Sequence, residues 1–123
     1  MSIRVLLAED HEVLRRAVRQ LLELDPGIQV IAEAEDLGET LRAFTELKPE
    51  IVVMDLYMVK RCAIEDEEAA VLVAKAIPKL IAMSYANDEE AQQLAALCCA
   101  EKLLDKMRLG QELIPAIHRS VSE

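Results

Sequence analysis

Four short apolar runs in this chain each lead into particular polar side chains, and this order constrains the fold more than any other feature. The runs are residues 3–8, which lead into Glu9 and Asp10; 51–54, into Asp55; 80–83, into Ser84; and 103–104, into Asp105 and Lys106. If the runs are parallel strands of one sheet, their carboxyl ends lie along the edge where open α/β sheets bind ligands. Carboxylates, a hydroxyl and an ammonium would then meet there, and these groups suit a divalent cation and a phosphoryl group.

Segments with helical periodicity separate the apolar runs. Apolar residues at three- and four-residue spacing predict helices around residues 13–22, 37–47, 64–75 and 87–98, and a last helix after Gly110. We expect Asp36 to cap the second of these helices, since Asp is a favoured N-cap residue. Val13 and Leu97 are expected on the buried faces of the first and fourth helices. Residues 28–34 alternate in polarity and predict a further strand.

The alternation of strands and helices predicts a (βα)5 fold, a doubly wound, five-stranded parallel sheet of the flavodoxin-like type. The strands are almost continuously apolar, which is typical of parallel sheets that are covered on both faces. Right-handed crossovers restrict the topology, and we expect the strand order 2-1-3-4-5. The switch point of that order lies between the first and third strands, so Glu9, Asp10 and Asp55 would line the cleft there.

Composition and charge exclude several classes of protein. The chain has 123 residues, enough for one domain, and its net charge of −9 argues against a nucleic-acid-binding surface. No apolar stretch reaches the roughly 18 residues that span a bilayer, and the N-terminus lacks the pattern of a signal peptide. Cys62, Cys98 and Cys99 fit no zinc-binding spacing. We interpret them as small buried hydrophobic residues in a reducing, cytoplasmic environment.

Each polar residue at a strand end also has an ordinary structural explanation. Asp10 could cap the first helix, Asp55 and Ser84 could form turns, and Lys106 could be a solvated surface charge. Together, however, the carboxylates would repel one another, since two unit charges about 4 Å apart interact by roughly 4 kcal/mol at an effective dielectric constant of about 20. Oxygen ligands of this kind suit Mg²⁺, and a carboxylate beside the ion can attack phosphorus to form an aspartyl phosphate.

The same segments carry a resemblance to a known family. Residues 5–11, 52–58, 82–84 and 103–106 match the functional segments of that family in type and order. Over essentially its whole length the chain resembles a response-regulator receiver domain of two-component signalling. Residues 111–117 are similar to the last helix of receivers that are attached to LuxR-type DNA-binding domains.

The resemblance implies a role for each matching residue. Asp55 would accept a phosphoryl group from a phosphohistidine on a sensor histidine kinase. Ser84 and Lys106 would contact the phosphoryl group and act as switch residues. The Mg²⁺ ligands would be Glu9, Asp10, Asp55 and the backbone carbonyl of Tyr57.

The resemblance also implies how such a domain works in a longer protein. Residues 1–123 would form the receiver, and a DNA-binding output domain, through which alone DNA would be contacted, would lie outside this chain. The receiver would be a cytoplasmic regulator without contact to a membrane, and not an enzyme, although it would assist its own phosphorylation and dephosphorylation. A homodimer would form either through the first and last helices or through the side of the fourth helix.

Four positions depart from the pattern of the family. Val59 replaces a usual proline and Ala63 a usual glycine, so the loop after Asp55 should be less constrained or differently shaped. Tyr85 replaces a small residue, and Leu103 replaces the aromatic switch residue. Switching by an aromatic ring at position 103 is therefore impossible.

These departures motivate an alternative function. The chain could be a pseudo-receiver, a protein-interaction module that signals without phosphorylation. Lys60 and Arg61 place two positive charges near the acids, and we interpret them as a solvated loop pair rather than as phosphate contacts. A flavin-binding protein or a phosphatase of the same architecture fits less well. The chain has no glycine-rich phosphate loop, and Tyr57 stands where such a phosphatase would carry a second aspartate.

Overall fold

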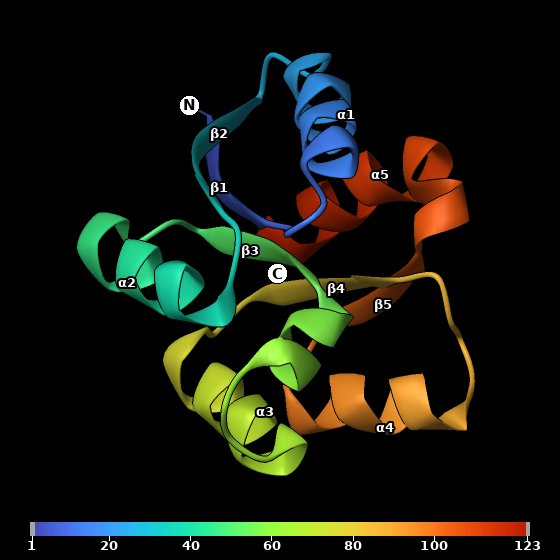
Figure 1. The fold of residues 1–123 in the computed structure, drawn as a ribbon. Helices are drawn as coiled ribbons and strands as arrows, with labels where there is room; N and C mark the ends of the chain where they lie inside the picture. Colours follow the sequence, from blue (N-terminus) through green and yellow to red (C-terminus); the bar gives the residue numbers. More distant parts are fainter. Residues whose placement is uncertain (1, 123) are drawn as a thin grey trace.

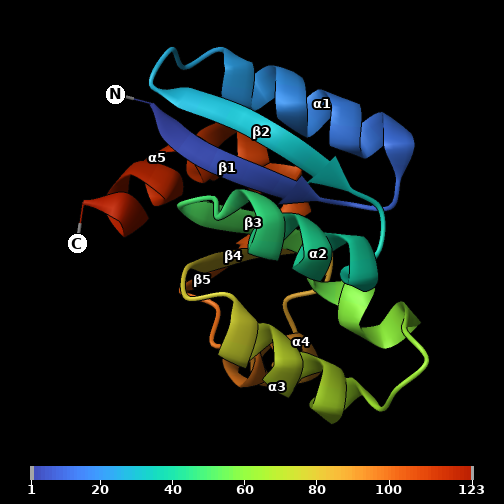
Figure 2. The same cartoon turned by 90° about the vertical axis from the view of Figure 1, so that its left-hand side faces the viewer.

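Residues 2–122 are described by a computed structural model, and they form one parallel sheet with helices on both faces (Figures 1 and 2). The strands are β1 (Ile3–Ala8), β2 (Ile28–Ala34), β3 (Ile51–Asp55), β4 (Leu80–Ser84) and β5 (Lys102–Asp105), in the spatial order β2-β1-β3-β4-β5. The α-helices are α1 (Glu12–Glu23), α2 (Leu37–Leu47), α3 (Asp66–Ala76), α4 (Glu89–Leu97) and α5 (Leu109–Val121). Two 3-10 helices, η1 (Leu56–Arg61) and η2 (Lys106–Arg108), follow β3 and β5. The predicted fold class and strand order are confirmed.

Two apolar cores lie on opposite faces of the sheet. Val5 and Leu7 of β1 face α1 and α5, whereas Leu6 and Ala8 of the same strand face α2, α3 and α4. Figure 1 shows these two layers, with α1 and α5 on one side of the sheet and α2, α3 and α4 on the other. All residues of β3 and β4 are buried, which explains why those strands are so continuously apolar.

The helix boundaries lie close to those predicted. The Asp36 side chain accepts a hydrogen bond from the backbone N–H of Glu39 at 2.8 Å, so it caps α2 as expected. The third helix begins at Asp66, two residues later than predicted. The last helix begins at Leu109 and includes Gly110, which therefore does not precede it.

The expected burial of Val13 and Leu97 is wrong. Val13 is 71% exposed and Leu97 is 42% exposed. In α1 the buried residues are Val18 and Leu22, one turn apart, and Val13 is out of phase with that stripe. The buried stripe at α4 consists of Ala91, Leu94, Ala95 and Cys98. Leu97 lies beside this stripe. The part of the α4 surface that contacts the rest of the protein is narrower than the apolar stripe of the helix, so Leu97 at its margin stays partly exposed.

The three cysteines occupy different environments. Cys98 is fully buried, Cys62 is half-buried and Cys99 is exposed, with a left-handed φ of 57°. The interpretation of all three as small buried hydrophobic residues is therefore correct for Cys98 and wrong for Cys99. Burial raises the pKa of the Cys98 thiol to about 12.

We expect this difference to appear in thiol labelling. Because the thiolate is the nucleophile, Cys98 in the folded protein should react with iodoacetamide at pH 8 at least about 100-fold more slowly than Cys99. Mass spectrometry of proteolytic fragments after timed labelling would measure both rates. In urea the two rates should converge, and a fast native reaction at Cys98 would contradict its burial.

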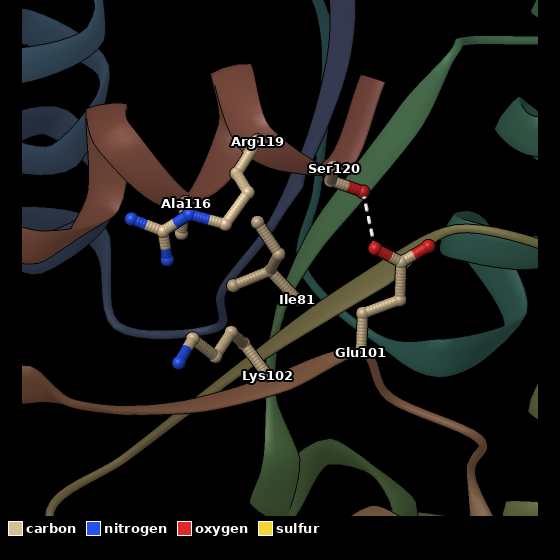
Figure 3. A pocket seen from close by; sticks show the side chains of 6 residues that line it. All are labelled: Ile81, Glu101, Lys102, Ala116, Arg119 and Ser120. Carbon is tan, nitrogen blue, oxygen red and sulfur yellow. Dashed lines mark hydrogen bonds between the residues drawn. The ribbon is translucent and has the colours of Figure 1, made fainter. Parts of the chain in front are cut away.

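A cavity of about 440 Å³ lies at the amino end of β5, beside α5 (Figure 3). The Ser120 hydroxyl donates a hydrogen bond to Glu101 Oε2 at 2.5 Å, and Lys79 Nζ donates to the Ser120 carbonyl at 2.5 Å. These bonds tie the end of α5 to the sheet at the edge opposite the carboxyl ends of the strands. Within residues 2–122, no helix is both long enough and apolar enough to cross a membrane.

Candidate acidic site at the carboxyl edge of the sheet

The polar residues that end the strands meet at the carboxyl edge of the sheet. One carboxylate oxygen from each of Glu9, Asp10 and Asp55 lies within 4.8 Å of the others. Lys106 Nζ lies 2.8 Å from Glu9 Oε1 and 3.4 Å from Asp55 Oδ1. The predicted convergence of these four residues is confirmed. This convergence follows from the strand order. Strands β1 and β3, which carry the three acids, are neighbours, and β5, which leads into Lys106, lies in the same half of the sheet as β3.

Most of this cluster is buried. Glu9 is 0% exposed and Asp55 1%, and the Lys106 side chain is 6% exposed, whereas the Asp10 side chain is 38% exposed. Burial raises the pKa of Glu9, and the nearby charge of Asp55 acts in the same direction. The Lys106 ammonium and the backbone N–H of His11 oppose this shift. The charged form of Glu9 therefore depends on a nearby positive charge to offset the effect of its burial.

The donor set fits Mg²⁺. In an octahedral Mg²⁺ shell the ligand oxygens lie at 2.0–2.1 Å from the ion and so at most about 4 Å apart. The three carboxylate oxygens lie within 4.8 Å of one another, so side-chain adjustments of about 1–2 Å would let them share one ion, in which neighbouring ligands are about 3 Å apart. Among the described residues, Glu9 Oε1 is also a buried oxygen that no donor reaches with hydrogen-bond geometry, although the Lys106 ammonium is close to it.

A cavity of about 430 Å³ opens above the acids. It is lined by Glu9, Asp10, His11, Leu14, Asp55, Tyr57, Arg61, Tyr85 and Lys106. Its volume exceeds that of a phosphoryl group with several waters, since one water takes about 30 Å³ of liquid volume. Asp55 lines this cavity, although it is only 1% exposed.

Local contacts fix the two buried carboxylates in place. Asp55 Oδ1 accepts a hydrogen bond from the backbone N–H of Tyr57 at 3.1 Å, which makes Asp55 the N-cap of η1. Glu9 Oε2 accepts a hydrogen bond from the backbone N–H of His11 at 3.1 Å. The capping of α1, which Asp10 could have provided, comes instead from His11, whose Nδ1 accepts from the backbone N–H of Leu14.

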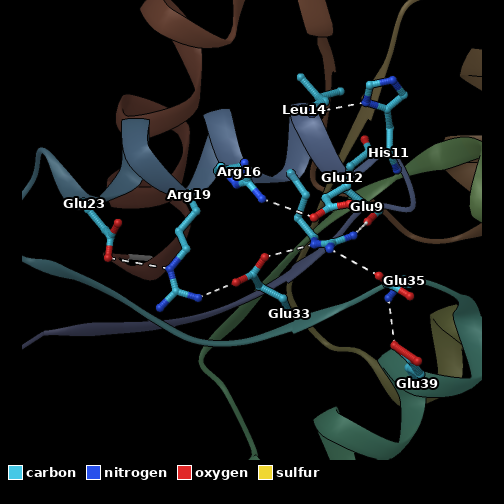
Figure 4. A network of polar contacts seen from close by, with 11 residues as sticks. Glu9, His11, Glu12, Leu14, Arg16, Arg19, Glu23, Glu33, Glu35 and Glu39 are labelled. Atoms are coloured by element: carbon cyan, nitrogen blue, oxygen red, sulfur yellow. Dashed lines mark hydrogen bonds and ion pairs between the residues drawn. The ribbon is translucent and has the colours of Figure 1, made fainter.

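A network of arginine and glutamate side chains supports the end of β1 (Figure 4). Arg15, whose side chain is 12% exposed, donates from Nη1 to the backbone carbonyl of Glu9 at 2.9 Å. The same guanidinium pairs with Glu33 at 2.9 Å and with Glu35 at 3.3 Å. Arg19 pairs with Glu33 as well. The backbone that carries Glu9 is thus tied to α1 and β2 together.

Arg61 lies in the acidic site, which the sequence analysis did not predict. Its Nη1 is 3.0 Å from Asp10 Oδ2 and 3.1 Å from Asp55 Oδ2. The interpretation of Lys60 and Arg61 as a solvated pair is therefore wrong. Lys60 pairs with Glu90 of α4, and its Nζ lies 5.4 Å from the centroid of the Tyr57 ring. A 3-10 helix has three residues per turn, so Arg61, six residues after Asp55, lies on the same side of η1 as Asp55.

The altered loop is well packed. Met58 and Val59 of η1 are 2% and 0% exposed, so at position 59 a buried apolar side chain anchors the segment where proline is usual in the family. In residues 2–122 the non-glycine residues with positive φ are Lys48 and Cys99, so Ala63 needs no left-handed backbone. The absence of a glycine at position 63 therefore creates no strain.

The remaining predicted residues lie at the ends of β4 and β5. Ser84 is 1% exposed, and its Oγ accepts a hydrogen bond from the backbone N–H of Ala86 at 3.0 Å, which is the turn role considered for it. Tyr85 is 63% exposed, and Lys106 Nζ lies 5.1 Å from the centroid of its ring. Leu103 packs against the apolar core beneath α2, α3 and α4.

Comparisons with known proteins agree with this geometry. The family model described as the response regulator receiver domain matches residues 5–118. The transcriptional regulatory protein LiaR of Bacillus subtilis is 37% identical over 90 residues, which are 72% of this chain and 41% of LiaR. The DNA-binding transcriptional activator DevR/DosR of Mycobacterium tuberculosis is 31% identical over 115 residues, 94% of this chain and 52% of that protein. The chain thus spans about half the length of these curated relatives.

Solved structures show the same fold. A two-component response regulator of the LuxR family from Aurantimonas sp. SI85-9A1 superposes with a TM-score of 0.85 at 28% identity, covering 99% of this chain and 86% of that one. The response regulator domain of Thermotoga maritima CheB superposes with a TM-score of 0.83 at 24% identity, covering 100% and 98% of the two chains. With the family model matching most of its length, the chain belongs to the response regulator receiver domains.

Proposed function

We propose that this receiver takes a phosphoryl group onto Asp55 from a sensor histidine kinase, in a reaction that depends on Mg²⁺. The observation that carries the proposal is the convergence of Asp55 with Glu9, Asp10 and Lys106 beneath an open cavity. A buried aspartate with two acidic neighbours and an ammonium is suited to bind a cation and then to act as a nucleophile. As a two-component regulator, the protein would act in the cytoplasm.

The chain's own residues would prepare the transfer. An Asp55 oxygen attacks phosphorus, the bond from phosphorus to the histidine nitrogen breaks, and the electron pair stays with the imidazole. The backbone N–H of Tyr57 holds Asp55 in one orientation for this attack. Glu9, Asp10, Asp55 and the carbonyl of Tyr57 would hold Mg²⁺, which when bound offsets negative charge on the transferring group.

Lys106 and Ser84 would respond to the new charge. Lys106 now pairs with Glu9 and Asp55, and phosphorylation of Asp55 replaces one of those partners by a phosphoryl group. The Ser84 hydroxyl, now bonded to the N–H of Ala86, would turn toward a phosphoryl oxygen. The Tyr85 ring lies beside the Lys106 ammonium, so a movement of Lys106 would also move Tyr85, which follows β4. An aromatic residue at position 103 would not be needed for this step.

The output is proposed to be transcriptional. LiaR is named a transcriptional regulatory protein and DevR/DosR a DNA-binding transcriptional activator, and both are about twice as long as the part of them that this chain matches. With a net charge of −9, the receiver itself is unsuited to grip DNA. A DNA-binding domain outside these 123 residues, and pairing of two receivers, would carry that step.

Binding of beryllofluoride, a mimic of the phosphoryl group, tests the proposal. In ¹H–¹⁵N NMR spectra we expect beryllofluoride with Mg²⁺ to shift the amide signals of Tyr57, Ala86 and Met107, which lie at the ends of three strands. Either component alone should produce a smaller and different change. If the pair of ligands leaves these signals unmoved, Asp55 is not a phosphoacceptor.

The pseudo-receiver remains the alternative, and one observation favours it. Arg61 already neutralises Asp10 and Asp55 without a metal. If that ion pair is permanent, the site is a structural one and signals without phosphorylation. An unchanged spectrum in the beryllofluoride experiment would support this alternative.

A further inference from the structure

The Arg61 guanidinium shares its oxygen partners with the Mg²⁺ site. Nη1 contacts Oδ2 of Asp10 at 3.0 Å and Oδ2 of Asp55 at 3.1 Å, and so bridges the ends of β1 and β3. An ion bound at 2.0–2.1 Å from either oxygen would lie no more than about 5 Å from this nitrogen. The Mg²⁺ ion and the Arg61 guanidinium would then repel each other beside the same two carboxylates.

We propose that Arg61 is a built-in competitor of the metal ion. In the metal-free protein it bridges Asp10 and Asp55, and it must leave at least one of them before Mg²⁺ can bind. Arg61 thereby sets the Mg²⁺ concentration at which the receiver becomes competent for phosphorylation. The inference rests on the proposed function, because it assumes that the acids are the Mg²⁺ site.

The Arg61 side chain is exposed enough to move away from Asp10 and Asp55, and acidic residues lie near it on the other side. Its side chain is 49% exposed, unlike that of Lys106 at 6%, so moving it exposes little new surface. It also borders a second cavity of about 220 Å³, which separates η1 from the start of α2. Glu35 and Asp36 line that cavity, and a displaced guanidinium would share the Glu35 carboxylate with Arg15 and the Asp36 carboxylate with the cap of α2.

The neighbouring Lys60 provides a matched control. Lys60 belongs to the same 3-10 helix and carries the same charge, but it pairs with Glu90 of α4 and lies over the Tyr57 ring. Replacing either residue by alanine removes one positive charge from the same turn of the chain. A general electrostatic effect would act on both variants, whereas competition for the metal acts through Arg61 alone.

Calorimetric titration of the 123-residue chain with MgCl₂, without any phosphodonor, tests the inference. We expect Arg61→Ala to bind Mg²⁺ roughly 5- to 20-fold more tightly than the wild type, within the usual range of coupling between two sites. Lys60→Ala should stay within about twofold of the wild type, as expected for an exposed ion pair. Arg61→Lys, which keeps the charge but loses the guanidinium fork, should fall between Arg61→Ala and the wild type.

Thermal unfolding gives an independent measurement. In EDTA, Arg61→Ala should melt below the wild type, because Asp10 then loses its counterion and repels Asp55, which keeps only Lys106. At one and the same Mg²⁺ concentration well above both dissociation constants, its melting temperature should rise more than that of the wild type, since the stabilisation by a ligand grows with the logarithm of its affinity. Lys60→Ala should show the same increase on Mg²⁺ addition as the wild type.

The outcomes separate this inference from the proposed function. Equal and measurable Mg²⁺ affinities in the wild type and Arg61→Ala would overturn the competition and leave the metal site standing. Weaker binding by Arg61→Ala would also overturn it, because Arg61 would then assist the metal. Absence of Mg²⁺ binding in every protein would overturn the metal site itself, and the inference with it.

Discussion

Replacing Asp55 by asparagine should reduce phosphorylation by a small phosphodonor such as acetyl phosphate by more than about 100-fold. The amide has nearly the same shape as the carboxylate, and its oxygen can still accept the Tyr57 N–H, so the fold should be kept. It is not a nucleophile toward phosphorus, however, and nucleophilic attack is the step that Asp55 is proposed to provide. Intact-mass spectrometry at neutral pH, with loss of the added mass after acid or hydroxylamine treatment, measures the aspartyl phosphate.

Asp105 offers a matched control for this substitution. It ends β5 as Asp55 ends β3, and its Oδ1 accepts the backbone N–H of Met107 at 2.8 Å, as that of Asp55 accepts Tyr57. Asp105 does not belong to the acidic cluster, so Asp105→Asn should keep phosphorylation within about threefold of the wild type. Full phosphorylation of Asp55→Asn would show that the acceptor has been misassigned.

Replacing Lys106 by alanine should both destabilise the metal-free protein and weaken its response to phosphoryl mimics. The Lys106 ammonium is buried between Glu9 and Asp55, at 2.8 and 3.4 Å. Its loss leaves the buried Glu9 carboxylate without a counterion, while Asp55 keeps Arg61, and breaking a buried pair of this kind lowers the free energy of unfolding by about 3 kcal/mol. Urea unfolding in EDTA measures this change, and Mg²⁺ should recover part of it.

The binding measurements separate a structural role of Lys106 from a phosphate-contacting one. Beryllofluoride should bind Lys106→Ala at least about tenfold more weakly. Mg²⁺ affinity should be kept or rise, since Lys106 is no metal ligand and its removal takes a positive charge away from Glu9 and Asp55. The control is Lys102→Ala, which removes an exposed lysine from the start of the same strand. If Lys106→Ala instead lost its Mg²⁺ affinity and kept its beryllofluoride affinity, the role assigned to Lys106 would be wrong.

Predictions from the sequence were right where they depended on residues near one another in the chain, and wrong where they depended on tertiary packing. The Asp36 cap was predictable because a cap depends on residues only three apart. The exposure of Val13 and Leu97 was not, since an apolar stripe can be wider than the surface it meets. The contact of Arg61 with the acids was not predicted for a similar reason. Its position depends on the 3-10 helix that follows β3, and the helix propensities of the residues do not predict so short an element.

The architecture and most of the residues of the acidic site could be predicted from the pattern of apolar and polar residues along the chain. Continuous apolar strands separated by amphipathic helices allow few topologies, and in a parallel sheet every residue that ends a strand lies on one edge. Glu9, Asp55 and Lys106 are therefore neighbours as soon as the strand order is known. The presence of Arg61 beside the acids became evident only in the folded chain, because side chains on loops are placed by their contacts and not by the periodicity of the backbone. Arg61 has a partner in Asp55 since η1 folds back toward β3, and no pattern along the chain records that contact.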